Sequence, residues 1–168
     1  MSNEYLENLD LFASLPDSEK KILSTSLVLK NFDAETELCT QGAVASSCYI
    51  ILEGSVRVFL VPDNDNIDLE APQQLIATLG KNEFIGEVAL LQGGTRSATC
   101  IAGPEGVTVA ELGREEFDHI LLSKNTFAYR LLDVISSQLA KYTVASVKSL
   151  QRLAKEEAEK IEAEKEAQ

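Results

Sequence analysis

Residues 84–99 read FIGEVALLQGGTRSAT and combine the features of a short helix with those of an anion site. The apolar run Val88 to Leu91 follows a Gly-Glu step, so the sequence predicts a helix that opens at Gly86. Backbone N–H groups at a helix start are unpaired and attract an anion, and Gly86 has no Cβ to keep a ligand away. Arg96 follows a Gly-Gly break and can fold back onto the same anion as a two-pronged donor.

Glu87 adds a different kind of contact to the same stretch. Its carboxylate accepts hydrogen bonds, so it suits the hydroxyl groups of a ligand better than an anionic group. One ligand with both an anionic end and a sugar hydroxyl is a nucleotide. Taken singly, these residues also fit an ordinary hairpin break and a surface arginine near Glu87. Their combination at this spacing favours the ligand site.

The same stretch resembles the phosphate-binding cassette of the cyclic-nucleotide-binding domain family, which includes bacterial catabolite activator proteins and regulatory subunits of protein kinase A. The family pattern is roughly F-G-E-[LIV]-A-L followed by R-[STA]-A. The resemblance implies that Arg96 pairs with the cyclic phosphate, with help from the backbone at Ala89 and from Ser97. It also implies that Glu87 accepts from the ribose 2′-hydroxyl, and that the backbone at Gly86 contacts the ribose. The expected ligand-binding residues of the cassette are Gly86, Glu87, Val88, Ala89, Arg96 and Ser97.

The residue after the cassette arginine bears on which nucleotide binds. In the family, a threonine there favours cGMP, whereas alanine or serine is common where cAMP is bound. Ser97 occupies this position, so the resemblance favours cAMP and leaves cGMP possible. The sequence contains no Gly-Lys-Ser/Thr phosphate loop, and Glu87 alone is not a catalytic pair. We therefore expect a binding module and not an enzyme.

Length and composition fit one domain with an extension. The chain has 168 residues, of which 45% are hydrophobic, and a formal net charge of −12. This acidity argues against non-specific binding to nucleic acids or to anionic membranes. No apolar run approaches the length of a membrane span, and the start MSNEYLENLD is unlike a signal peptide. The sequence favours a cytoplasmic protein.

The cysteines and the single histidine carry no metal or catalytic pattern. Cys39, Cys48 and Cys100 are odd in number, lie in strand-like contexts and lack metal-ligand spacing. We predict buried, reduced thiols, as in a cytosolic protein. His119 has no nucleophile or metal partner near it in the sequence, and we place it on the surface or at an interface.

The pattern between residues 27 and 113 is mainly β. Short runs that alternate in polarity are separated by turn signals, which indicates a sandwich or a barrel. The family version is an eight-stranded jelly roll, and in it Gly54 would sit at a tight turn. We predict a final hairpin around residues 103–106 and a polar loop over 62–72. The predicted strands are 27–29, 36–40, 48–52, 55–60, 74–79, 98–102 and 107–112.

Helical patterns flank this β region on both sides. Residues 1–26 form a predicted helical lead-in of two pieces, with Pro16 at the start of the second piece. Residues 114–168 form a predicted short helix over 114–122 and a long helix from about Thr126. The fold is thus expected to be mainly β with flanking helices.

The long helix carries an apolar stripe. Leu132, Ile135, Leu139 and Tyr142 follow a 3-4 spacing, which favours packing against a second copy of the helix or against the barrel. We favour a homodimer. The charged end of the helix fits either a solvated single helix or a coiled-coil linker. No turn glycine or basic recognition helix follows Tyr142, so direct DNA binding is not expected.

Two functions follow for testing. The first is a cyclic-nucleotide sensor that relays occupancy through its C-terminal helix to a dimer partner or to a downstream effector domain, such as a signalling phosphodiesterase or cyclase. In the family, a residue of this helix often covers the base. The resemblance implies that Tyr142 stacks on the purine and Thr143 bonds its edge, although Tyr142 also fits a helix-pair seam. The alternative function is a degenerate jelly-roll scaffold that binds no nucleotide.

Overall fold

The computed structural model describes residues 15–61, 73–123 and 126–166. The chain divides into two compact units between Leu132 and Asp133. The helices are α3 (Asp17–Ser26), α4 (Glu87–Gln92), α5 (Arg114–Leu122) and α6 (Thr126–Glu166). The strands are β1 (Leu27–Phe32), β2 (Glu37–Cys39), β3 (Ser47–Leu60), β4 (Gln74–Leu79), β5 (Phe84–Ile85) and β6 (Thr99–Gly113). The first piece of the predicted lead-in and the predicted loop over 62–72 lie outside the described residues.

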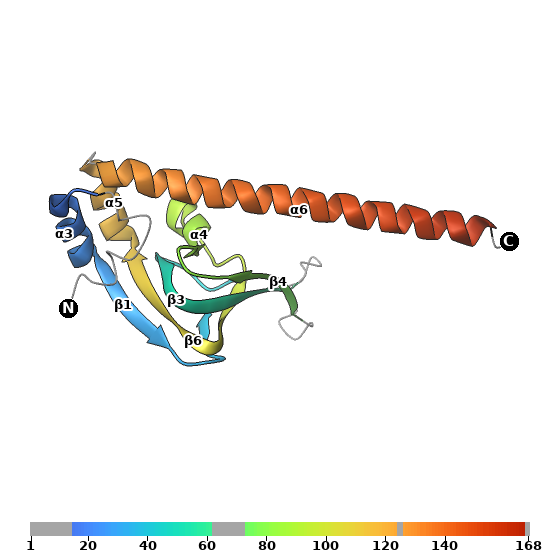
Figure 1. Cartoon of the computed structure of the whole chain (residues 1–168), viewed down its shortest axis with the longest axis horizontal. Helices are drawn as coiled ribbons and strands as arrows, with labels where there is room; N and C mark the ends of the chain where they lie inside the picture. The colour runs from blue at the N-terminus through green and yellow to red at the C-terminus, as the bar shows by residue number, and fades with distance from the viewer. Residues whose placement is uncertain (1–14, 62–72, 124–125, 167–168) are drawn as a thin grey trace. The chain divides into compact units, whose positions relative to one another are not determined.

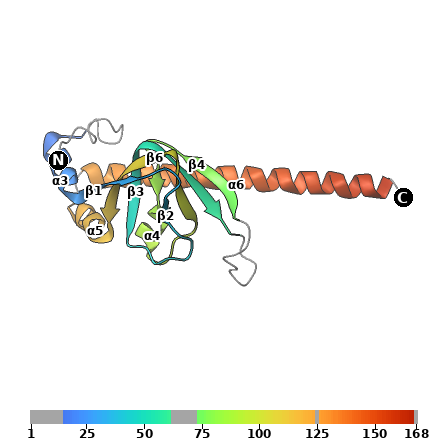
Figure 2. The same ribbon diagram turned by 90° about the horizontal axis from the view of Figure 1, so that it is seen from below.

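The strands form one antiparallel sheet in the order β1-β6-β3-β4, with β2 paired to β6 and β5 paired to β3. Two views of the ribbon show that this sheet curls around itself (Figures 1 and 2). The prediction of a mainly β fold with flanking helices is confirmed. The expected count of eight strands is not confirmed, because the described residues form six.

The count differs because β3 and β6 each run through a position where the sequence predicts a break. The predicted hairpin at residues 103–106 is wrong, since β6 continues from Thr99 to Gly113. Gly54 likewise lies within β3 and not at a tight turn, and the pairing of β3 with β6 shifts register beside it. Gly54 has φ +82°, and a Cβ there would overlap the carbonyl oxygen of Gly106. These glycines therefore bend two long strands without ending them.

Most buried apolar residues of the first unit lie on the strands and on α4, and the helices at one end of the sheet add to this core. Both views place α3 and α5 side by side at this end (Figures 1 and 2). Their apolar faces are buried, with Leu23 of α3 and Phe117 and Ile120 of α5 at most 2% exposed. His119 is on the exposed side of α5, as predicted.

The second unit contains α6 from Asp133 onward. The predicted start of this helix at Thr126 is confirmed, and so are the predicted bounds of α5. Within the described ranges, no helix is both long enough and apolar enough to cross a membrane.

Candidate functional site

The helix predicted to open at Gly86 is present as α4. Its first residue is Glu87, and Gly86 caps it with φ +77°, a left-handed conformation that favours glycine. Ala89 and Leu90 are buried and fix α4 to the roll, where it packs on β3. A Cβ on Gly86 would overlap the guanidinium of Arg96. A glycine is therefore required here both by the backbone and by the approach of Arg96.

Arg96 is buried within the cassette, with 7% of its surface exposed. Its Nη1 donates to the carbonyl oxygen of Gly86 over 3.5 Å, and its Cζ lies 5.5 Å from the centre of the Tyr49 ring. No carboxylate among the described residues forms an ion pair with it. The guanidinium thus has a carbonyl and an aromatic face beside it, but no described carboxylate within ion-pair distance.

The backbone on both sides of Arg96 is held by a segment distant in sequence. The Gly42 N–H donates to the Arg96 carbonyl over 2.8 Å, and the Arg96 N–H donates to the Ala43 carbonyl over 2.8 Å. A bridge between Val44 and Thr95 extends this pairing. The turn after β2 therefore fixes the position from which the Arg96 side chain reaches Gly86.

Glu87 is the second buried ionisable residue of the cassette, with 7% of its surface exposed. Burial raises the pKa of its carboxyl, while its own backbone N–H and the charge of Arg96 act in the opposite direction. The remaining cassette residues differ in access, because Val88 is 37% exposed and Ser97 is exposed, whereas Ala89 is 4% exposed. The structure brings Gly86, Glu87 and Arg96 together.

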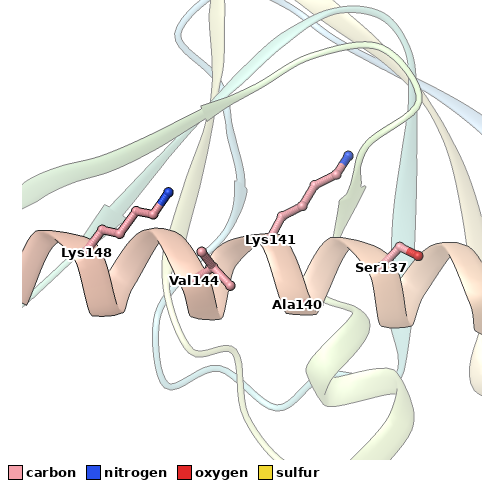
Figure 3. Close-up of a pocket in the computed structure, with 5 residues that line it drawn as sticks. All are labelled: Ser137, Ala140, Lys141, Val144 and Lys148. Atoms are coloured by element: carbon pink, nitrogen blue, oxygen red, sulfur yellow. The ribbon is translucent and has the colours of Figure 1, made fainter.

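The two predicted base contacts lie on α6 in the second unit. The Thr143 hydroxyl donates to the Leu139 carbonyl of its own helix over 2.9 Å, and Tyr142 is half-buried. Figure 3 shows residues of α6 on either side of Tyr142 and Thr143. The side chains of Lys141 and Lys148 project from the same side of this helix. The roles of Tyr142 and Thr143 at the base stay predictions.

Sequence reasoning missed the contacts that cross from other elements to the cassette. Tyr49 lies in a strand that was predicted, but nothing in the pattern marks it as the partner of Arg96. Arg114, the first residue of α5, donates through Nη1 to the carbonyl of Leu90 near the end of α4 over 2.8 Å. Its Nε donates to both carboxylate oxygens of Asp118, over 2.9 and 3.0 Å. Arg114 thus joins the cassette helix to α5.

The cysteines differ from one another in environment. The prediction of buried thiols is confirmed for Cys48 and Cys100, but Cys39 is half-buried. Burial raises the pKa of the Cys48 thiol to about 12. Cys39 is the cross-strand partner of Cys100, and a hydrogen bond from Cys100 lowers the pKa of the Cys39 thiol, as does the charge of Arg96.

Comparison with known sequences identifies relatives of this chain. The sequence model of the cyclic nucleotide-binding domain matches residues 29–124. Over 141 residues the chain is 31% identical to the cAMP-dependent protein kinase type II regulatory subunit of Drosophila melanogaster, covering 84% of this chain and 36% of that protein. Over 114 residues it is 28% identical to human cGMP-dependent protein kinase 2, covering 68% of this chain and 14% of the kinase. The chain corresponds to one part of each relative.

Comparison with solved structures gives the same fold. A cyclic nucleotide-binding domain from Methylobacillus flagellatus superposes with a TM-score of 0.69 and 24% identity, covering 85% of this chain and 76% of that one. The matched residues 29–124 span more than half of the 168 residues and include the whole cassette around Arg96. The chain therefore belongs to the cyclic nucleotide-binding domain family.

Proposed function

We propose that this chain is a sensor module that binds a cyclic nucleotide at residues 84–99, with the cyclic phosphate at Arg96. One observation carries the proposal: the guanidinium of Arg96 is buried, and no described carboxylate pairs with it. A buried charge is costly unless an opposite charge lies beside it. A cyclic phosphate supplies one negative charge and two free oxygens, which match the two-pronged donor geometry of arginine.

In this proposal, the other cassette residues contact the ribose and the remaining part of the cyclic phosphate. Glu87 accepts a hydrogen bond from the ribose 2′-hydroxyl, and the backbone of Gly86 contacts the ribose. The backbone N–H groups of Val88 and Ala89 face the phosphate at the start of α4. The exposed hydroxyl of Ser97 donates to the same group. The support for this assignment is that Glu87 and Arg96 are buried beside the same glycine.

We further propose that cAMP is preferred over cGMP. Ser97 follows Arg96 where the family pattern has threonine in proteins that favour cGMP. The relatives leave both nucleotides open, because the fly subunit is named for cAMP and the human kinase for cGMP. Titration of each nucleotide into the protein measures the preference directly, and tighter binding of cGMP would contradict it.

In this proposal, each of three parts of the chain has its own role. Residues 27–113 form the binding roll, residues 1–26 lead into it, and residues 114–168 relay its occupancy. The relay reaches a dimer partner or a downstream effector domain, such as a signalling phosphodiesterase or cyclase. The chain is then a regulatory module of the cytosol and not itself an enzyme. Arg114 supports this division, because it joins the cassette helix to the first helix of the relay.

Homodimer formation through α6 is the form of relay that we favour. Among the described residues of this helix, four large apolar or aromatic side chains are substantially exposed: Tyr129 at 68%, Leu132 at 36%, Val144 at 53% and Val147 at 47%. Ile135 of the predicted stripe, by contrast, is already buried in the single chain, with 0% of its surface exposed. A second copy of the helix would remove this apolar surface from water. In sedimentation velocity, the protein should run as a dimer at high micromolar concentration. A monomer with and without nucleotide would contradict the dimer.

Calorimetric titration of cAMP tests the binding site itself. Arg96→Ala should cost about 2–5 kcal/mol of binding, the range for truncating one partner of a buried charge pair. Arg96→Lys keeps the charge but loses the two-pronged geometry, so it should recover only part of the affinity. Near-normal affinity of Arg96→Ala would remove Arg96 from the site.

Thermal melting distinguishes the sensor from the scaffold. A ligand at about 100 times its dissociation constant stabilises a fold by about 2.7 kcal/mol. If neither cAMP nor cGMP raises the melting temperature of the wild-type protein, the degenerate-scaffold alternative holds. A circular dichroism spectrum that is unchanged in Arg96→Ala shows that any loss of binding is not a loss of fold.

A further inference from the structure

Two cysteines face each other across the strand pair nearest the cassette arginine. Cys39 of β2 and Cys100 of β6 are partners in the antiparallel register, which shifts between Glu37 and Cys39. Directly opposed residues in such a pair have Cα atoms about 4.5–5.5 Å apart, within the range of disulfide-bonded cysteines. The two side chains also interact, because each thiol shifts the pKa of the other, and the Cys39 thiol donates to the carbonyl of Ala98 on the Cys100 side over 3.9 Å.

The surroundings of the pair activate Cys39 in particular. Cys39 is half-buried and so accessible, whereas Cys100 is 4% exposed. The thiolate of Cys39 is stabilised by the proton of Cys100 and by the positive charge of Arg96, and both effects lower its pKa. A stabilised and accessible thiolate is the form that reacts with oxidants.

The third cysteine provides an internal contrast. Cys48 lies within β3 opposite Leu112 and is completely buried. Loss of hydration raises the pKa of its thiol to about 12, so it stays protonated at neutral pH. Cys48 is therefore an unreactive control within the same fold.

We propose that Cys39 and Cys100 form a peroxide-sensitive dithiol, which closes to a disulfide between β2 and β6 beside Arg96. In the first step, the Cys39 thiolate attacks an oxygen atom of hydrogen peroxide. The S–O bond forms and the O–O bond breaks, so Cys39 is oxidised to a sulfenic acid while the peroxide is reduced to hydroxide. That hydroxide takes a proton from solvent and leaves as water.

The second step closes the bridge. The sulfur of Cys100 attacks the sulfur of Cys39, so that the S–S bond forms as the S–O bond breaks. The departing hydroxide takes the proton of the Cys100 thiol and leaves as a second water. In total, two thiols and one hydrogen peroxide give one disulfide and two waters. Strand β2 has only three residues and, among the described strands, pairs with β6 alone, so a small shift of β2 can accommodate the bridge.

Peptide mapping under non-reducing conditions tests the proposal. The full chain, without nucleotide and at low concentration, is treated with hydrogen peroxide at pH 7 and digested after blocking of free thiols. We expect a peptide pair linked through Cys39 and Cys100, reversed by dithiothreitol, with Cys48 still a free thiol. Cys39 should react at least about tenfold faster than Cys48. Cys48→Ser should form the same bridge at the wild-type rate.

Single variants separate the two chemical steps. Cys100→Ser should stop at the sulfenic acid of Cys39, which dimedone traps, whereas Cys39→Ser should give neither the acid nor the bridge. Circular dichroism checks that each variant is folded. If a variant does not fold, the peptide map of the wild-type protein still tests the proposal. The proposal is overturned if peroxide leaves both cysteines as thiols, or if Cys39 is found linked to Cys48 or to another chain. Because no nucleotide is present, this outcome is independent of whether the cassette binds one.

Discussion

The position of the Arg96 side chain depends on the residue at position 86, and the approach of Arg96 in turn requires glycine there. The left-handed backbone at Gly86 and the lack of a Cβ allow the guanidinium to lie against the start of α4. The Tyr49 ring lies beside the same guanidinium at 5.5 Å. An anion that enters here finds a charge that is already oriented, so binding loses little side-chain entropy.

In the nucleotide-free protein at neutral pH, Glu87 should lower the free energy of unfolding relative to a neutral side chain at the same position. Burial raises its pKa in the folded state above the unfolded value, so the folded state binds the proton more tightly. Stability contributed by this group is therefore greatest below the unfolded pKa of about 4.3 and falls as pH rises through the raised pKa. Glu87→Gln should raise the melting temperature, and more so at pH 8 than at pH 5.

The same change should weaken nucleotide binding, by less than Arg96→Ala does, because an amide oxygen still accepts a hydrogen bond. Glu105→Gln at an exposed glutamate is the control for a simple loss of charge. Equal affinity of the wild-type protein for cAMP and for its 2′-deoxy analogue would contradict contact between Glu87 and the ribose. A melting difference that does not change with pH would contradict the burial argument.

Bound nucleotide should slow the oxidation of Cys39. The charge of Arg96 is one cause of the lowered pKa of this thiol, and a phosphate beside Arg96 would neutralise that charge. The thiolate fraction of Cys39 then falls at pH 7, and its reaction with peroxide should slow several-fold in saturating cAMP. Mass spectrometry of the time course measures the rate. An unchanged rate, with binding shown by calorimetry, would mean that the phosphate does not sit at Arg96.

The sequence alone predicted the cassette residues and missed their tertiary partners. Gly86, Glu87 and Arg96 stand within one short stretch, so their spacing carries the signal. Tyr49 and Cys39 reach the same place through strand pairing, and pairing between distant strands leaves no local pattern. Their roles could be recognised only from the register.

At the scale of elements, the helices were easier to predict than the strands. The bounds of α5 follow from its apolar periodicity, and α4 follows from the glycine that precedes it. The breaks expected near Gly54 and at residues 103–106 were wrong, because glycine marks a bulge in a long strand as readily as it marks a turn. Which of the two occurs depends on whether the chain on either side finds the same neighbour strand.

Arg114 is the contact between elements that most directly concerns the cassette. It donates to the carbonyl of Leu90 near the end of α4, where carbonyl groups lack partners within the helix. Arg114→Ala should destabilise α4 by about 1 kcal/mol, the scale of a cation at a helix C-terminus. Hydrogen exchange should then be faster at Leu90 to Gly93, and cAMP affinity should fall.

Asp118→Asn is the matched control for this prediction. It removes the ion pair that orients Arg114 but keeps the donor to α4, so its effect on exchange should be smaller. If exchange over Leu90 to Gly93 is unchanged in Arg114→Ala, then α4 does not depend on α5 through this contact. In that case the relay must leave the cassette through its apolar packing.

At the scale of the whole molecule, the chain joins a roll to a long helix. The dividing point between Leu132 and Asp133 lies within α6, so one continuous helix belongs to both units. An α-helix transmits a displacement along its axis because its backbone hydrogen bonds hold each turn to the next. In the proposed relay, a change at the beginning of α6 would therefore reach residues near its end without a flexible joint.

If Tyr142 covers the base of the nucleotide, as the family resemblance implies, then α6 acts as a lid and is part of the ligand site. We call this the lid hypothesis. A jelly roll alone leaves one face of the purine in water, and the aromatic ring of Tyr142 could cover that face, with Thr143 bonded to the edge of the base. Tyr142→Ala should then weaken cAMP binding by about tenfold or less, the scale of one aromatic stacking contact. Its affinity should still fall further on Arg96→Ala, because the phosphate contact is separate.

Hydrogen exchange distinguishes a lid from a helix-pair seam. If Tyr142 covers the base, ligand occupancy fixes α6 and shifts the population of its positions, so the segment 137–147 should gain protection when cAMP is added. If Tyr142 belongs to a seam between two helices, protection of this segment should depend on protein concentration and not on cAMP. Identical exchange of this segment in the free and bound forms would end the lid hypothesis. The occupancy signal would then have to travel from α4 through Arg114 and α5.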